Sequence, residues 1–297
     1  MDARVADFLN YMLSRRGASR NTVALYGSDL EQFCGFLIDA SLSTDRLSWE
    51  SVDQGTITEF ILELRRKRNA EATIAHKVAA LKSFFAFLRA EGELHRNPLE
   101  DLRIPRAGTT LPRPLPAEEV DSLLEQPAKR NTPEALRDRA MLEVLYATGM
   151  RVSELVSLDT NSIQIQDRRS VMRCLGKGAK ERSIPIHDKA AGALQTYLDQ
   201  ARPRLVRNRI EPALFVNRRG KRLTRQGFWL LLRAYARQAG IQTPVTPHTL
   251  RHSFAVRLLR GGAPLGNVQE LLGHARVATT VTMYGKPAPN TRRRSAT

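Results

Sequence analysis

Two arginines in the second half of this 297-residue chain lie in settings that suit a phosphate group. Arg151 follows the segment ATGM, in which a glycine ends one predicted helix, and it opens the next. A helix start points backbone N–H groups at anions, and an arginine adds a forked donor. Arg251 lies in HTLRH, three residues after His248, so both share one face of a helix. Alone, HTLRH is more typical of a solvated helix face, and Arg151 could be an ordinary surface arginine.

A lysine, a histidine and a tyrosine extend this group. Lys177 lies in GKGAKE, between two short apolar runs that predict a β-hairpin with a glycine-rich turn. His274 follows LLG, where a glycine marks a helix end, and Tyr284 comes ten residues later. Paired guanidinium groups can neutralise the charge that grows on a phosphodiester, a tyrosine can attack phosphorus, and a lysine or histidine can protonate the leaving oxygen. Together the residues predict phosphoryl transfer with no metal and no other cofactor.

The wording and order of ATGMRVSEL, GKGAKER, HTLRHSFA, LLGHA and the late tyrosine resemble the tyrosine recombinase family, and within it the bacterial Xer recombinases. The resemblance runs from about residue 4 to Tyr284. It implies that Arg151 and Arg251 grip the scissile phosphate of DNA. It also implies that Lys177 is the general acid for the 5′-hydroxyl leaving group.

The same resemblance assigns roles to the other three residues. His248 would help to activate the tyrosine, His274 would hydrogen-bond the phosphate, and Tyr284 would form a 3′-phosphotyrosyl link. That link retains the energy of the broken phosphodiester, so strands would rejoin without ATP or metal. The implied partners are double-stranded DNA and further recombinase subunits, in a homo- or hetero-tetramer on two DNA sites that exchanges strands through a Holliday junction.

Two features depart from the family pattern. The interval from His274 to Tyr284 is one residue longer than in Xer proteins, which could change how the tyrosine segment enters the site. After Tyr284 the chain reads GKPAPNTRRRSAT, and its prolines do not suit the helix that docks family members on a neighbouring subunit. The arginines of this tail could bind DNA instead.

The elements that must position these residues fall into two groups. Apolar spacing predicts helices near 4–14, from Ser19 or Asn21 to Leu37, near 52–67 and near 71–91. Five prolines between Pro98 and Pro116 then predict an extended linker, with the domain boundary near residue 108. The basic run 65–68 could contact DNA or be a solvated helix end favoured by the helix dipole.

The second group of predicted elements contains both helices and strands. Helices are expected near 117–126 and 133–147, after Arg151, and near 188–201, 224–239, 246–260 and 264–273, with strands at 170–175 and 182–186. The fold class is therefore mainly α with a small β-sheet. The resemblance implies a helical, SAM-like core-binding domain over 1–107 and an α+β tyrosine-recombinase catalytic domain over 108–297.

The charge distribution points to a polyanionic partner. The chain has 47 Lys and Arg against 30 Asp and Glu, yet residues 1–110 hold 15 of each sign, so the whole net charge of +17 lies in the remainder. Lysine and arginine contacts to phosphates are the usual source of nucleic-acid affinity. Two distant cysteines exclude a disulfide framework, and no apolar run approaches a membrane span or a signal peptide. We therefore expect a cytoplasmic protein without a membrane partner.

Three alternatives remain open at this point. The chain could be an integrase or resolvase of a mobile element rather than a resolver of chromosome dimers, with the same chemistry. It could be a type IB topoisomerase that acts as a monomer, or a DNA-binding protein without catalysis. A covalent complex on suicide DNA separates enzyme from binder, and recombination between two sites separates recombinase from topoisomerase.

Overall fold

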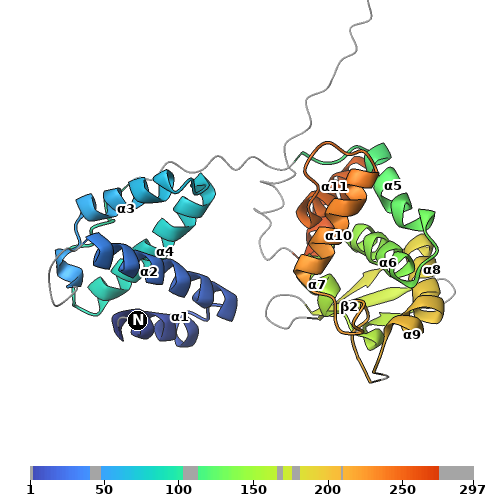
Figure 1. Ribbon diagram of the computed structural model, residues 1–297, viewed down its shortest axis with the longest axis horizontal. Helices are drawn as coiled ribbons and strands as arrows, with labels where there is room; N and C mark the ends of the chain where they lie inside the picture. Colours follow the sequence, from blue (N-terminus) through green and yellow to red (C-terminus); the bar gives the residue numbers. More distant parts are fainter. Residues whose placement is uncertain are drawn as a thin grey trace, which may run out of the picture. The chain divides into compact units, whose positions relative to one another are not determined.

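The computed structural model describes residues 3–40, 48–102, 113–165, 170–175, 181–208 and 210–273. Internal contacts divide the chain into two compact units, Met1–Thr110 and Leu111–Thr297 (Figure 1). Each unit has a hydrophobic core of its own. The predicted boundary near residue 108 lies outside the described residues, so its placement stays a prediction.

The first unit consists of α1 (Ala3–Ser14), α2 (Arg20–Ala40), the 3-10 turn η1 (Trp49–Ser51), α3 (Gln54–Arg66) and α4 (Glu71–Ala90). The helices follow the predicted ones closely, because their apolar faces meet in one aromatic core. The rings of Phe33 and Phe60 pack edge to face at 5.0 Å, and those of Trp49 and Phe84 at 4.8 Å. Helix α3 starts later than predicted, since the Asp53 carboxylate accepts the N–H of Thr56 at 2.8 Å and caps it.

The basic run at the end of α3 is partly neutralised within its own unit. Arg65 forms an ion pair with Glu71 at 3.0 Å, and Lys67 forms one with Glu63 at 2.6 Å. Both pairs are largely exposed to solvent. For Arg65 and Lys67 this pairing favours the solvated helix end over a dedicated phosphate contact.

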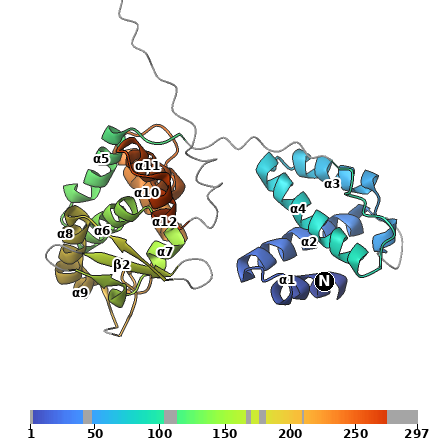
Figure 2. The same cartoon turned by 180° about the vertical axis from the view of Figure 1, so that it is seen from behind.

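The helices of the second unit include the buried helix α6. They are α5 (Ala117–Glu125), η2 (Gln126–Lys129), α6 (Pro133–Thr148), α7 (Val152–Ser157), η3 (Thr160–Ser162), α8 (Asp188–Thr196), the π-helix η4 (Tyr197–Ala201), α9 (Arg202–Leu205), α10 (Arg225–Gln238), α11 (Pro247–Arg260) and α12 (Leu265–Leu272). Helix α6 is buried along most of its length. Figures 1 and 2 show it between α8 on one side and α10 and α11 on the other.

A small antiparallel sheet completes this unit, in the order β1 (Ile163–Gln164), β2 (Val171–Leu175), β3 (Glu181–Pro185). The β2–β3 pairing confirms the predicted hairpin, and its register sets Met172 opposite Ile184 and Cys174 opposite Arg182. The side chains of Met172, Cys174 and Ile184 are buried on the core side. Strand β1 was not predicted, because two residues carry no readable alternation.

The predicted fold class, mainly helical with a small sheet, is therefore confirmed. A boundary in the second unit also differs: the helix expected over 188–201 is α8 followed by the short π-helix η4, which leads directly into α9. Among the described helices there is none with the length and hydropathy that a membrane span requires.

Candidate active site

Arg251 is held in the interior of the second unit. Its helix, α11, starts where the Thr246 hydroxyl accepts the N–H of Thr249, and it is anchored by Leu250 and Phe254, both buried as predicted. The Arg251 residue is 6% exposed. Its Nη1 donates to the carbonyl oxygen of Gly149 at 2.6 Å, and its Nη2 donates to the carbonyl oxygen of Leu272. This arginine therefore joins the C-terminal ends of α6 and α12.

The end of α6 is shaped for this contact. Gly149 has a left-handed backbone, with φ of +57°, and ends the helix as the sequence predicted. A Cβ atom at this position would lie 2.3 Å from Cδ1 of Phe254. Only glycine thus lets α11 pack so close that Arg251 reaches the Gly149 carbonyl.

Arg151, the N-cap of α7, lies beside the same chain segment. Its Nη2 donates to the carbonyl oxygen of Gly273 at 3.1 Å, and its Nη1 donates to Oε1 of Glu154 at 3.0 Å. Arg151 and Arg251 therefore bind the carbonyls of consecutive residues, Leu272 and Gly273. The backbone N–H of Arg151 donates to Oε2 of Glu154 at 2.8 Å, so the anion at this N–H is a carboxylate of the protein itself.

Glu154 and Arg182 complete the cluster, and neither was predicted from the sequence. Arg182, on β3, donates from Nη1 to Oε1 of Glu154 at 3.1 Å and from Nη2 to Oε2 at 2.8 Å. Burial raises the pKa of the Glu154 carboxyl, but hydrogen bonds from Arg182 and from the Arg151 N–H outweigh it and leave the pKa below its usual value. Glu154 is therefore ionised at neutral pH. The spacing of three residues between Arg151 and Glu154 could have indicated their contact, whereas nothing in the sequence indicates the contact of Glu154 with Arg182.

Of the six predicted residues, the structure describes three. Arg151 and Arg251 come together, while His248, in the first turn of α11, is exposed. Lys177, His274 and Tyr284 lie outside the described residues, as does the tail after Tyr284. Their neighbours in the chain are placed: β3 begins four residues after Lys177, and Gly273 directly precedes His274.

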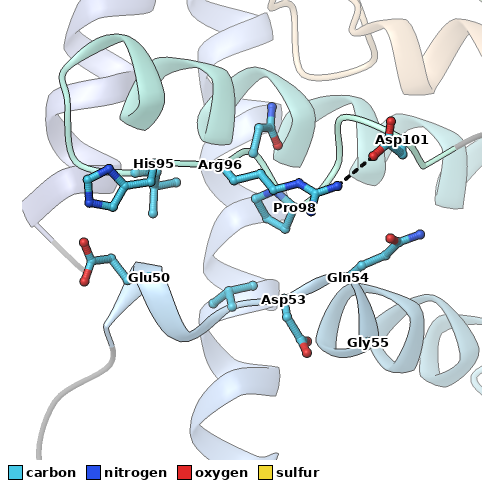
Figure 3. Close-up of a pocket in the computed structure, with 11 residues that line it drawn as sticks. Glu50, Asp53, Gln54, Gly55, His95, Arg96, Pro98 and Asp101 are labelled. Atoms are coloured by element: carbon cyan, nitrogen blue, oxygen red, sulfur yellow. Dashed lines mark hydrogen bonds and ion pairs between the residues drawn. The ribbon is translucent and has the colours of Figure 1, made fainter.

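A pocket of about 620 Å³ lies in the first unit, and none of the residues of this cluster lines it (Figure 3). It lies between the start of α3 and the segment after α4, and an ion pair of Arg96 with Asp101 at 3.0 Å spans part of its wall. Glu50, Asp53 and Asp101 give the lining more acidic than basic charge. A surface of that sign does not suit the phosphates of DNA, so we do not assign the chemistry here.

Comparison with known proteins identifies the family. The Phage integrase family matches residues 113–290, and its N-terminal SAM-like domain matches residues 5–92. The chain is 48% identical over 280 residues to tyrosine recombinase XerC of Herpetosiphon aurantiacus, across 94% of this chain and 89% of that protein. It is 40% identical over 281 residues to tyrosine recombinase XerD of Listeria innocua, across 94% of this chain and 93% of that protein.

A solved structure shares the fold. The XerH site-specific recombinase, in a post-cleavage complex with a palindromic difH substrate, superimposes with a TM-score of 0.74. At 23% identity, the match covers 94% of this chain and 80% of that one. Taken with the sequence matches, the chain belongs to the phage integrase family, and within it to the Xer-type tyrosine recombinases, which are site-specific recombination enzymes.

Proposed function

We propose that this recombinase cuts and rejoins duplex DNA through a 3′-phosphotyrosyl intermediate on Tyr284, with pairs of strands exchanged through a Holliday junction. The observation that carries the proposal is the pair of guanidinium groups of Arg151 and Arg251 on the consecutive carbonyls of Leu272 and Gly273. Two cations fixed side by side can neutralise a phosphodiester in its transition state. The bulk of the positive charge of the chain lies in this unit.

The electrostatics of the pair suit a phosphate. Arg251 donates hydrogen bonds to the neutral backbone carbonyls of Gly149 and Leu272, which help to orient its guanidinium group. Arg151 shares the carboxylate of Glu154 with Arg182, so that one negative charge is divided between two cations. A preorganised site of this kind stabilises negative charge without reorganising during the reaction.

The chemistry then needs a nucleophile and a proton donor. The phenol oxygen of Tyr284 forms a bond to phosphorus while the bond from phosphorus to the 5′-oxygen breaks. The phenol has an ordinary pKa of about 10, so its proton must be removed as it attacks, a role that we propose for His248. Lys177 gives a proton to the departing 5′-oxygen, and His274 hydrogen-bonds the phosphate. The reverse steps rejoin the strands, so neither ATP nor a metal is consumed.

The proposal also divides the work between the parts of the chain. Residues 1–107 form the helical domain that binds the core DNA site, and residues 108–297 form the catalytic domain. The names of the curated relatives and the DNA present in the XerH complex support double-stranded DNA as the partner. We further propose a tetramer on two DNA sites, acting in the cytoplasm.

Covalent trapping tests the mechanism. Wild-type protein mixed with nicked suicide DNA in EDTA and without ATP should form a denaturant-resistant adduct. Tyr284→Phe should bind the same DNA and form none, whereas the control Tyr11→Phe, which removes a hydroxyl from the first unit, should react normally. An adduct in Tyr284→Phe would move the nucleophile to another tyrosine. A reaction that stops in EDTA and returns with Mg²⁺ would overturn the phosphotyrosyl mechanism.

Recombination between two sites tests the assembly. Wild-type protein on two cognate DNA sites should yield joined products and Holliday junctions, with four subunits per synapsed complex measured by light scattering. Relaxation of supercoiled DNA by single subunits, without recombinant products, would instead identify a topoisomerase.

A further inference from the structure

Arg182 occupies the point where three parts of the candidate site meet. It is the second residue of β3 and lies five residues after Lys177. Its two terminal nitrogens bind both oxygens of Glu154, the partner of Arg151. Its Nη1 also lies 2.6 Å from the position that a Cβ atom on Gly273 would occupy. One guanidinium group, carried by β3, therefore contacts α7 and lies beside the end of α12.

The negative charge of Glu154 opposes the positive charge of Arg151, and Arg182 reduces this effect. A carboxylate that is 8% exposed and bonded to Arg151 alone would pair fully with that arginine and offset its positive charge. The side chain of Arg182 is 17% exposed, and hydrogen bonding to Glu154 holds its pKa above the usual value although burial lowers it. Arg182 therefore stays charged and neutralises part of the negative charge of the Glu154 carboxylate. Arg151 is then oriented by Glu154 without losing its attraction for an anion.

We propose that Arg182 is a positioning residue for strand cleavage, which acts through Glu154 to orient Arg151 and to keep its charge available to the scissile phosphate. This inference rests on the proposed phosphate-binding role of Arg151. It makes Arg182 the residue that joins β3 to Arg151 through Glu154. Gly273, whose backbone is left-handed with φ of +62°, leaves the space that the guanidinium group of Arg182 occupies.

Single-turnover cleavage of suicide DNA at saturating protein tests the proposal. Arg182→Met should slow cleavage by roughly 10- to 100-fold, by analogy with the loss of a hydrogen-bond partner that orients a metal ligand. Arg182→Lys, which keeps the charge but not the paired contact, should fall between Arg182→Met and wild type. The control Arg173→Met removes the same charge from β2, where the side chain is exposed and its Nη2 donates to the carbonyl of Asn161 at 3.1 Å. This control should cleave at the wild-type rate.

The decisive comparison is a double variant. Glu154→Gln together with Arg182→Met removes the carboxylate that Arg182 balances. The positive charge of Arg151 is then no longer offset by a neighbouring negative charge. The double variant should therefore cleave faster than Arg182→Met alone. A purely structural role predicts the opposite, because two buried changes would add their damage. A neutral methylphosphonate at the scissile position needs less positive charge, so the deficit of Arg182→Met should also shrink on that DNA.

Each outcome decides between the alternatives. A double variant no faster than Arg182→Met, or a deficit of Arg182→Met that is unchanged on methylphosphonate DNA, would overturn the inference. If Arg182→Met does not fold, as judged by its circular dichroism, then Arg182→Lys with and without Glu154→Gln gives the same comparison. Arg151→Ala separates this inference from the proposed function. If Arg151→Ala cleaves normally the proposed role of Arg151 is wrong, whereas if only Arg182→Met cleaves normally the inference alone fails.

Discussion

Gly149→Ala is expected to damage the site more than its size suggests. The residue has φ of +57°, and the added methyl carbon would meet Cδ1 of Phe254 at 2.3 Å and Cδ2 of Leu272 at 3.1 Å. Carbon atoms in contact prefer about 3.5–4.0 Å, so the Phe254 ring must move by more than about 1 Å. Phe254 lies three residues after Arg251 on α11, and the carbonyl of Gly149 is itself an acceptor for Arg251. The shift should therefore loosen the buried arginine.

The magnitude has two parts. A left-handed backbone costs a non-glycine residue about 1–2 kcal/mol, and overpacking a close-packed core costs about 1–3 kcal/mol more. The sum is about 2–5 kcal/mol in the free energy of unfolding. For a unit of this size each kcal/mol lowers Tm by roughly 2–4 °C, so a fall of roughly 4–20 °C is expected.

A matched glycine isolates the packing part. Gly240 has φ of +73°, but a Cβ atom there would meet nothing within 4 Å. Gly240→Ala carries only the backbone cost, about 1–2 kcal/mol, and should leave cleavage unchanged. The assay is calorimetry of the full chain together with single-turnover cleavage at saturating protein. Equal Tm values and equal cleavage rates for the two variants would refute the reasoning, because Phe254 would then not constrain the carbonyl that binds Arg251.

Three further predictions follow from the remaining contacts. Tyr235→Phe removes the hydroxyl that donates to the buried carboxylate of Asp138 at 3.0 Å and should cost about 1–3 kcal/mol of stability. The loss should be larger than for Tyr197→Phe, which frees a neutral backbone carbonyl, and equal losses of Tm would contradict this. Burial lowers the pKa of His252 from 6.5, so its contribution to stability should be lost as the pH falls from 6.5 through the lowered value, and His252→Gln should flatten the dependence of Tm on pH over that range. Lys177→Ala should slow cleavage of ordinary DNA by about 10² or more, and a 5′-bridging sulfur, which leaves without a proton, should restore it; without rescue, Lys177 would be a phosphate-binding residue.

Most of the fold was readable from the sequence, because its signals are local. The apolar spacing of Val23, Leu30 and Phe33 reports a helix face that is buried in the structure. The stops at Gly149 and Gly273 report left-handed ends. The elements that were not predicted are also explained locally. The two-residue strand β1 is too short to show a period, and the apolar pattern of the π-helix η4 resembles that of a continuous α-helix.

The site was readable only in part, for a physical reason. Arg151 and Arg251 were found because each stands in a distinctive short motif. Arg182 was missed because its partner, Glu154, is 28 residues away, and a bidentate contact between a strand and a helix leaves no periodic trace. Nor did the sequence show that Arg251 would be buried while His248, on the same predicted face, is exposed. That difference depends on how α6 and α12 pack against α11.

The end of α12 explains why these contacts belong together. The last carbonyls of a helix have no partner within the helix, and the helix dipole favours cations there. In this structure Arg251 and Arg151 bind the carbonyls of Leu272 and Gly273. The same hydrogen bonds therefore cap α12 and orient the two arginines. A helix of eight residues is marginal by itself, and α12 is held by the buried side chains of Val268 and Leu272. Docking of this one short helix therefore holds both arginines for which we propose a phosphate-binding role.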